Sequence, residues 1–481
     1  MKKQVFNPYL PSWEYIPDGE PRVFGERLYI FGSHDNAKGK DYCVNDYVTW
    51  SAPINDLSDW RYEEVIFKKS QTPWNTDEKP MYAPDVAKGP DGRYYLYYSV
   101  QNTSIMSVAV CDSPAGRYEY YGDVKMPNGH VLGHSKEDWF QFDPSILVDN
   151  DGRIFLYSGS GQNFNKRWGY PVVGCFVMEL EQDMLTVKGS PKILLPAKEK
   201  FTKPNFFEGA SVRHIGELYY LVFPATNISG LNYATSKYPD RDFTYRGRIH
   251  STSDIGYEGH SLMEARYPIG NNHGGLVEIN GEWYVFDHRQ TDQSGWRRQG
   301  VAEKIEIKPD GSIAMVDATS CGLNNGPLSG DGLYPAYIAC NLMSKATFGL
   351  RNPTKGPFVT QEGDDYNPPC EKKQESANGG IDGMPPVSYI SGIKNGCVVG
   401  YKYFDLRKTR HIRICIRGKA AGRLILSDQE DGRNIRAYFD INSSKDWMEY
   451  DADIEIIAER TPLYFIYSGR GMIEFLSFTL S

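Results

Sequence analysis

Long apolar runs are missing from this chain of 481 residues. Two lysines near the amino terminus have no apolar segment behind them, and no stretch of about 18 apolar residues follows anywhere. We therefore expect a soluble cytoplasmic protein that does not contact a membrane. An exported form whose leader has been removed is the alternative.

Cysteine motifs and basic runs are missing too. The eight cysteines contain no Cys-x-x-Cys pair and no zinc-finger spacing, so free thiols in a reducing cytoplasm are their simplest account. Lys and Arg number 53 against 61 Asp and Glu, which gives a net charge of −8. Without a basic run, the chain cannot follow phosphates along a strand, and this argues against nucleic acid as a partner.

Glycine, proline and tyrosine are abundant, with 47, 29 and 34 residues. This composition favours turns and β-strands over helices, so we expect an all-β protein. The aromatic fraction of 14% also suits sugar rings, whose apolar C–H faces pack on aromatic side chains.

A repeat runs through the amino-terminal part. Five glycines each open a short aromatic-rich run and are spaced 67, 60, 64 and 65 residues apart: Gly25, Gly92, Gly152, Gly216 and Gly281. β-rich repeats of such regular period are typical of small antiparallel sheets arranged around an axis. The repeat therefore predicts a five-bladed β-propeller.

One ionisable residue precedes each of these glycines by seven to nine positions: Asp18, Asp85, Asp143, Glu208 and His273. If each glycine marks the turn between the first two strands of a blade, these residues lie at equivalent places on the five first strands. Their side chains should then converge on one funnel. Two carboxyl groups facing each other there could hydrolyse a glycosidic bond, because an ionised one activates water and a protonated one delivers a proton.

The carboxyl-terminal part lacks the repeat. Strand-like runs reach to about residue 305, and Gly, Asn, Pro and Ser are dense at 321–330, which is the best linker candidate, with a boundary placed to within about ten residues. Short strands without a repeat follow, as is typical of a β-sandwich. We therefore predict a propeller at 1–310, a linker at 311–330 and a β-sandwich domain at 331–481.

The chain resembles glycoside hydrolase family 43 over about residues 6–310, through an ordered set of motifs: Asp18, Ala83-Pro84-Asp85, Asp143-Pro144-Ser145, Glu208-Gly209-Ala210 and His273-Gly274-Gly275. Members are five-bladed propeller hydrolases that remove arabinofuranose or xylose from plant polysaccharides with inversion of configuration. The resemblance implies that Asp18 is the general base and Glu208 the general acid. It implies that Asp143 tunes the pKa of the acid and holds it in position.

The base position departs from the family pattern. A proline usually follows the base directly, whereas Asp18 is followed by Gly19 and the proline comes at Pro21. Counting back from the next strand without gaps favours Asp18, with Glu20 as the competing candidate. For Asp85 we expect a structural role, because an Asp beside a proline is usually a turn former.

The resemblance also implies residues around the acids. His273 matches the axial histidine that supports a calcium ion and its waters in many members, with a hydrogen-bonded histidine without metal as the alternative. Arg298 matches the arginine that reaches the substrate or the carboxylates. The alternatives are that Arg297 takes this place or that Arg298 forms a surface salt bridge.

Three tryptophans lie in connecting segments, where they could stack on sugar or serve in ordinary packing: Trp74, Trp139 and Trp168. The carboxyl-terminal domain resembles a family 6 carbohydrate-binding module at 389–396 and 473–478. That resemblance implies a jelly-roll sandwich that binds sugar or only supports the propeller.

These inferences predict an inverting exo-hydrolase that releases terminal α-L-arabinofuranose from arabinoxylan-derived oligosaccharides. A β-1,4-xylosidase acting on xylo-oligosaccharides is an alternative, since both activities occur in similar members of the family. A noncatalytic propeller that binds sugar is the alternative of another class, and the three filled carboxylate positions argue against it.

Overall fold

A computed structural model describes residues 4–161, 169–197, 205–226, 229–344, 356–366, 384–455 and 458–481. The described chain is all-β, as predicted, and its helices are single 3₁₀ turns. Their bounds are η1 Lys69–Gln71, η3 Tyr257–Gly259, η4 Leu262–Glu264, η5 Gly322–Asn324 and η6 Ala336–Ile338. No helix within these ranges is long and apolar enough to span a membrane.

Five small antiparallel sheets follow one another along the amino-terminal part. The first comprises β1 Glu20–Phe24, β2 Arg27–Phe31, β3 Tyr47–Pro53 and β4 Arg61–Phe67. The second comprises β5 Asp85–Lys88, β6 Tyr94–Ser99, β7 Met106–Cys111 and β8 Glu119–Asp123. The third comprises β9 Ser145–Val148, β10 Ile154–Ser160, β11 Gly174–Leu180 and β12 Val187–Pro196.

The fourth and fifth sheets continue this order. The fourth comprises β13 Ser211–Ile215, β14 Leu218–Pro224, β15 Leu231–Ser236 and β16 Thr244–His250. The fifth has three strands, β17 Leu276–Ile279, β18 Glu282–Thr291 and β19 Ser294–Ile305. Within each sheet the strands pair in sequential order, so each sheet is a meander of hairpins.

The repeat glycines lie in the turns between the first and second strands of the five sheets, as predicted. All five have a left-handed backbone, with φ between 61° at Gly25 and 87° at Gly92. An added Cβ would meet no atom within 4 Å at these five positions. Glycine is therefore required for its conformational freedom and not for close packing.

Two largely buried arginines join the first strands of all five sheets. Arg22, on β1, binds Asp85 on β5 with Nε 3.0 Å from Oδ1, and it donates to a backbone carbonyl of β9 at 3.0 Å. Arg213, on β13, binds Glu20 on β1 at 2.6 Å and a backbone carbonyl of β17 at 3.0 Å. Strand β1 also contacts both β5 and β17, so the fifth sheet lies against the first.

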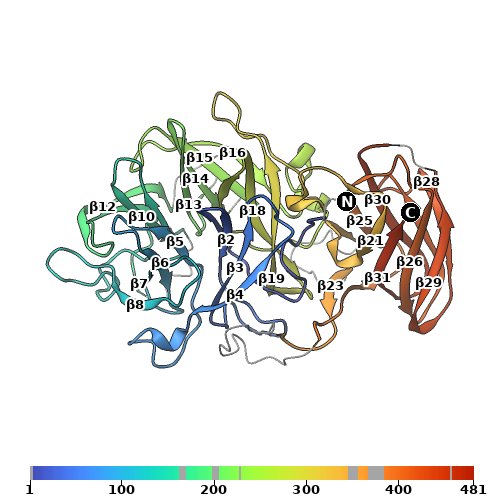
Figure 1. Ribbon diagram of the computed structural model, residues 1–481, viewed down its shortest axis with the longest axis horizontal. Coiled ribbons are helices and arrows are strands. Elements are labelled where there is room, and N and C mark those ends of the chain that lie inside the picture. The colour runs from blue at the N-terminus through green and yellow to red at the C-terminus, as the bar shows by residue number, and fades with distance from the viewer. Residues whose placement is uncertain are drawn as a thin grey trace.

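Two six-stranded sheets make up the carboxyl-terminal part and lie at one end of the molecule (Figure 1). One contains β20 Leu328–Ser329, β22 Asn341–Met343, β25 Val398–Asp405, β27 Ala420–Ser427, β28 Ile435–Ile441 and β30 Thr461–Gly471. The other contains β21 Gly332–Pro335, β23 Phe358–Gln361, β24 Ser388–Ile393, β26 His411–Gly418, β29 Ser444–Asp453 and β31 Ile473–Leu480. Both sheets contribute to one apolar core, through Leu424 and Phe465 from the first and Ile414 and Phe478 from the second.

The stretch 311–330, expected as a linker, packs between the two parts. Val316 N donates to the Ile249 carbonyl at 2.9 Å, and β20 pairs in parallel with β25. Ser329 N donates to Gln4 Oε1 at 3.1 Å, so the amino terminus lies at the same junction (Figure 1). The stretch therefore connects the two parts by contacts along its length.

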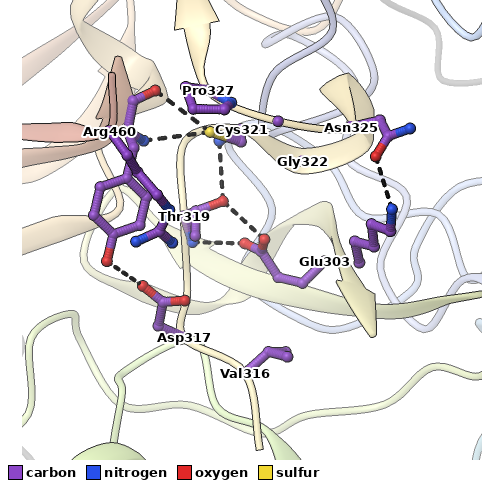
Figure 2. A pocket seen from close by; sticks show the side chains of 12 residues that line it. Glu303, Val316, Asp317, Thr319, Cys321, Gly322, Asn325, Pro327 and Arg460 are labelled. Atoms are coloured by element: carbon purple, nitrogen blue, oxygen red, sulfur yellow. Dashed lines mark hydrogen bonds between the residues drawn. The ribbon is translucent and has the colours of Figure 1, made fainter. Parts of the chain in front are cut away.

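A cavity of about 250 Å³ opens at this junction, and polar side chains line it (Figure 2). Glu303 accepts hydrogen bonds from N and Oγ1 of Thr319 at 2.6 and 2.8 Å, and Tyr403 donates to Asp317 at 2.8 Å. Lys402 lies nearby, with Nζ 3.4 Å from Asp317. The junction is thus held by charged and polar groups as well as by apolar packing.

We predict that Lys402→Ala destabilises the protein strongly. Lys402 is buried, and its Nζ also lies 2.8 Å from Asp254 in the amino-terminal part. Removing it leaves buried carboxylates without a counter-charge, which should lower the free energy of unfolding by about 3–5 kcal/mol. Urea denaturation followed by tryptophan fluorescence measures the loss.

Arg423→Ala is the matched control for this change. Arg423 forms an ion pair with Asp440 in which both side chains are more than half exposed, so its loss should cost under about 1 kcal/mol. Equal losses in the two variants would contradict a structural role for Lys402.

Candidate active site

The five residues singled out by the repeat lie at the starts of the five first strands. Only Asp85 is within its strand, whereas the others precede theirs by two or three residues: Asp18, Asp143, Glu208 and His273. The prediction that all five are on the strands is therefore corrected. The physical reason is a change of backbone direction, because Asp18, Asp143 and Gly209 have φ of 57°, 44° and 63° and interrupt the extended conformation.

Asp18 is a buried, ionised carboxylate. Its Oδ1 accepts from Arg298 Nη1 at 2.9 Å and its Oδ2 from Ser33 Oγ at 2.5 Å. Burial alone would raise the pKa of Asp18, but Arg298, the nearby imidazoles of His288 and His273 and the hydrogen bond from Ser33 together lower it to about 2. Asp18 is therefore ionised at any ordinary working pH and able to accept a proton.

Arg298 is held by a second carboxylate, Asp35. Its Nε and Nη2 donate to the two oxygens of Asp35 at 2.9 and 3.0 Å, in the bidentate geometry typical of strong pairs. The ring of Tyr42 covers the guanidinium, with its centroid 4.9 Å from Cζ. Arg297 instead binds Asp292, so the structure places Arg298, and not its neighbour, beside Asp18.

Asp143 and Glu208 form a second pair of carboxyl groups. Asp143 is buried, and burial together with the carboxylate of Glu208 raises its pKa well above the usual range. Two adjacent carboxyls disfavour double ionisation, so Asp143 favours its protonated form more than an ordinary aspartate does. Glu208 is half-buried. The site thus combines an acid of lowered pKa, Asp18, with an acid of raised pKa, Asp143.

His273 lies among the acids without a direct hydrogen bond to them. Its Nδ1 is 3.9 Å from Asp18 and 3.8 Å from Asp143, and its Nε2 is 3.9 Å from Oε1 of Glu20. These distances exceed hydrogen-bond length. Gly209 permits the close approach of the chain at Glu208, since an added Cβ would meet the His273 ring at 2.8 Å.

Two buried polar atoms near the acids lack hydrogen-bond partners among the described residues. Nε2 of His273 and Oε1 of Glu20 have no hydrogen bond within the described residues. A carboxylate oxygen and an imidazole nitrogen separated by one small gap fit a cation that takes water for its other ligands. Among the described residues, no group of three or more His, Cys, Asp or Glu has the spacing of a metal site.

The charges of Glu20 and Asp85 are each neutralised by an arginine that joins two sheets. Glu20 is fully buried and binds Arg213 and Ser211, the latter at 3.0 Å. Asp85 is also fully buried and binds Arg22. Both acids therefore join sheets. Asp18 keeps a side-chain exposure of 7% against 0% for Glu20, so Asp18 is the better placed of the two to meet a water molecule.

Comparison with known proteins decides the family. The model of glycosyl hydrolases family 43 matches residues 22–313. A protein of Thermoclostridium stercorarium named xylosidase/arabinosidase is 43% identical over 494 residues, covering 100% of this chain and 99% of the relative. The chain belongs to glycosyl hydrolases family 43. The resemblance found in the sequence is thereby confirmed.

Solved structures show the same fold. A family 43 arabinoxylan arabinofuranohydrolase from Bacillus subtilis, in complex with cellotetraose, has a TM-score of 0.51 at 20% identity and covers 99% of this chain and 97% of its own. A β-xylosidase/α-arabinofuranosidase from a compost microbial metagenome, solved with xylotriose in a calcium-free form, has a TM-score of 0.50 at 24% identity. It covers 63% of this chain and 95% of its own.

The tryptophans expected at the funnel of this family 43 chain lie in packing positions. Trp74 donates to Asp123 on β8, the outermost strand of its sheet, at 3.3 Å. Trp139 packs edge-on against Phe176, with ring centroids 5.4 Å apart. Trp168 is outside the described residues. Both contacts are with residues of the surrounding sheets, which agrees with the alternative of ordinary packing for Trp74 and Trp139.

Three site residues were missed by sequence reasoning: Asp35, Tyr42 and His288. His288 Nδ1 accepts from the backbone N of Asp18 at 3.2 Å, and burial lowers its pKa to about 4, so this imidazole is neutral. His288 lies on a second strand, and the other two lie between β2 and β3. A search limited to the residues before first strands could not find them.

We predict that Glu20→Gln costs more stability than Asp18→Asn. Glu20→Gln removes the carboxylate that neutralises the buried guanidinium of Arg213, at a cost of about 3–5 kcal/mol in the free energy of unfolding. Asp18→Asn leaves Arg298 with Asp35, so its loss should be smaller. Urea denaturation of the two variants measures both, and the reverse order would contradict the assignment of Glu20 to the structural ion pairs.

Proposed function

We propose that this chain is an inverting exo-glycoside hydrolase that releases terminal α-L-arabinofuranose from arabinoxylan-derived oligosaccharides. The observation that carries the proposal is the convergence of Asp18, which pairs with Arg298, and Asp143, which lies beside Glu208, around His273, with the pKa of Asp18 lowered and that of Asp143 raised. Environments that push the pKa values of neighbouring carboxyls apart assign base and acid roles.

Each carboxyl group has a role in this proposal. Asp18 takes a proton from water as the water attacks the anomeric carbon, and Arg298 keeps Asp18 ionised. Glu208 gives its proton to the leaving oxygen, since its longer side chain and partial exposure suit contact with a bound sugar. Asp143 keeps a proton available to Glu208 by disfavouring the charge on both groups.

A β-1,4-xylosidase acting on xylo-oligosaccharides is the second candidate. The 43% identical relative carries both activities in its name, and the compost enzyme was solved with xylotriose. Both sugars are pentoses, and an exo-acting site with one base and one acid serves either bond.

The proposal includes the architecture of the chain, which is a five-bladed propeller at 1–310, followed by the packed stretch 311–330 and a β-sandwich at 331–481. The five sheets in sequential order, and the two arginines that join their first strands, support five blades around one axis. The shared core of the two six-stranded sheets supports the sandwich. A jelly-roll course of its strands, as in family 6 carbohydrate-binding modules, belongs to the same proposal.

A hydrated calcium ion is part of the proposal. His273 and Glu20 would hold it through the two atoms that lack partners, and its charge would favour the ionised forms of the acids nearby. The cytoplasmic location stays a prediction.

We predict that Glu208→Ala separates two kinds of substrate. Hydrolysis of arabinoxylo-oligosaccharides should fall by about 10²–10⁴-fold, because the leaving oxygen then lacks its proton donor. Hydrolysis of p-nitrophenyl α-L-arabinofuranoside and p-nitrophenyl β-D-xyloside should fall less, since nitrophenolate needs little protonation. Initial rates on the three substrates measure the difference and also show which pentose is preferred.

Asp18→Ala provides the matched comparison. Water activation is needed whatever the leaving group, so this variant should lose activity on all three substrates alike. Equal losses of natural and aryl activity in Glu208→Ala would contradict its role as the acid. A wild-type protein that binds the sugars without cleaving any of them would favour the noncatalytic alternative.

A further inference from the structure

A segment of the carboxyl-terminal part reaches the candidate active site. Strand β23 and the residues after it, 358–366, pack beside the hairpin between β18 and β19. Thr360 Oγ1 donates to Asp292 at 3.0 Å, and Tyr15 OH donates to Gln361 Oε1 at 2.9 Å. These contacts cross from one part of the molecule to the other. The contacts place residues 358–366 beside the amino-terminal part, which carries the candidate active site.

Asp365, at the end of this segment, binds the chain next to Asp35. Its Oδ1 accepts from the backbone N of Ala37 at 2.6 Å, and its Oδ2 accepts from the side-chain amide of Asn36. Asp365 is half-buried, so these charge-assisted bonds are partly shielded from water. Its neighbour Asp364 differs, since its carboxylate pairs with the exposed ammonium of Lys38, at 2.7 Å.

The residues 36–43, here called the rim loop, begin where Asp365 binds and end at the Arg298 guanidinium. Cys43 N donates to Asp35 Oδ1 at 3.0 Å, and Arg298 Nη2 contacts Cys43 Sγ at 3.4 Å. Tyr42 covers Arg298. The loop also accepts from Trp296 Nε1 through the Gly39 carbonyl at 2.9 Å.

Both ends of the rim loop are thus tied to the pair formed by Asp35 and Arg298. Asp35 immediately precedes the loop, and its backbone N donates to the Tyr15 carbonyl at 3.0 Å. A shift of the loop would move Asp35, Tyr42 and Cys43 together. Arg298 touches all three and donates to Asp18, so its position depends on where the loop is held.

We propose that Asp365 is a positioning residue for the catalytic centre, acting through the rim loop on Arg298 and thereby on Asp18. The carboxyl-terminal part then contributes to turnover itself, whether or not it binds sugar. This inference rests on the proposed hydrolysis. Small displacements of a catalytic group are costly, because the bound geometry must stay close to that of the reaction.

The test compares Asp365→Ala and Asp365→Asn with Asp364→Asn in the full chain. We expect kcat/KM on the preferred p-nitrophenyl pentoside to fall roughly tenfold in Asp365→Ala, less in Asp365→Asn and not at all in Asp364→Asn. Asp364 and Lys38 have side chains 62% and 58% exposed, so their pair contributes little.

The separate effects on kcat and KM distinguish positioning from a merely structural role. A displaced Arg298 would move Asp18, to which it donates a hydrogen bond, so kcat should fall in Asp365→Ala while KM changes much less. Circular dichroism shows whether the variant is still folded under the assay conditions.

Hydrogen exchange gives a readout that does not depend on activity. Amides of the rim loop should exchange faster in Asp365→Ala than in Asp364→Asn. Wild-type kcat and exchange in folded Asp365→Ala would overturn the inference, and if that variant does not fold, the same result in Asp365→Asn would do so. A wild-type protein that cleaves no pentoside would instead overturn the proposed function.

Discussion

The contact of Arg298 with two carboxylates is the interaction on which the site depends. Arg298 lies on the fifth sheet, whereas Asp18 and Asp35 belong to the first, so one guanidinium joins the two ends of the series of sheets. A buried arginine requires complete partners, and the two carboxylates supply them. The same contact lowers the pKa of Asp18. Packing of the last sheet against the first and the lowered pKa of Asp18 therefore depend on the same contact.

The opposite behaviour of Asp143 has an equally local cause. Asp18 and Asp143 are both buried acids two residues before a first strand, and both have positive φ. Asp18 accepts a hydrogen bond from the guanidinium of Arg298, while Asp143 lies near the carboxylate of Glu208. Equivalent placement in the fold thus leads to opposite shifts of pKa, because the neighbouring group differs.

The repeat of the sequence predicted the framework well, for physical reasons. Gly25 and its four equivalents lie at turns with a left-handed backbone. Glycine adopts this conformation most readily, so the spacing of the glycines alone predicts the turns. The acids were singled out by their position seven to nine residues before those glycines. Asp35 could not be predicted, since its partner Arg298 is far along the chain and an Asp after a strand usually forms a turn.

The contribution of the carboxyl-terminal part was equally hidden from the sequence. Asp365 binds a backbone amide of the amino-terminal part, and such a contact leaves no pattern of residue types in either segment. The stretch 311–330 is rich in turn residues and still packs along its length, because its polar groups find partners at the junction. Composition predicted its irregular backbone and not its contacts.

The most direct test of the account is proton NMR of the sugar released in the first minutes of hydrolysis, before mutarotation. The account predicts the inverted anomer, which is β-L-arabinofuranose from an α-L-arabinofuranoside or α-D-xylose from a β-D-xyloside, because water activated by Asp18 attacks the anomeric carbon directly. Release of the retained anomer would contradict it, since that outcome requires a covalent sugar–enzyme intermediate in place of a general base.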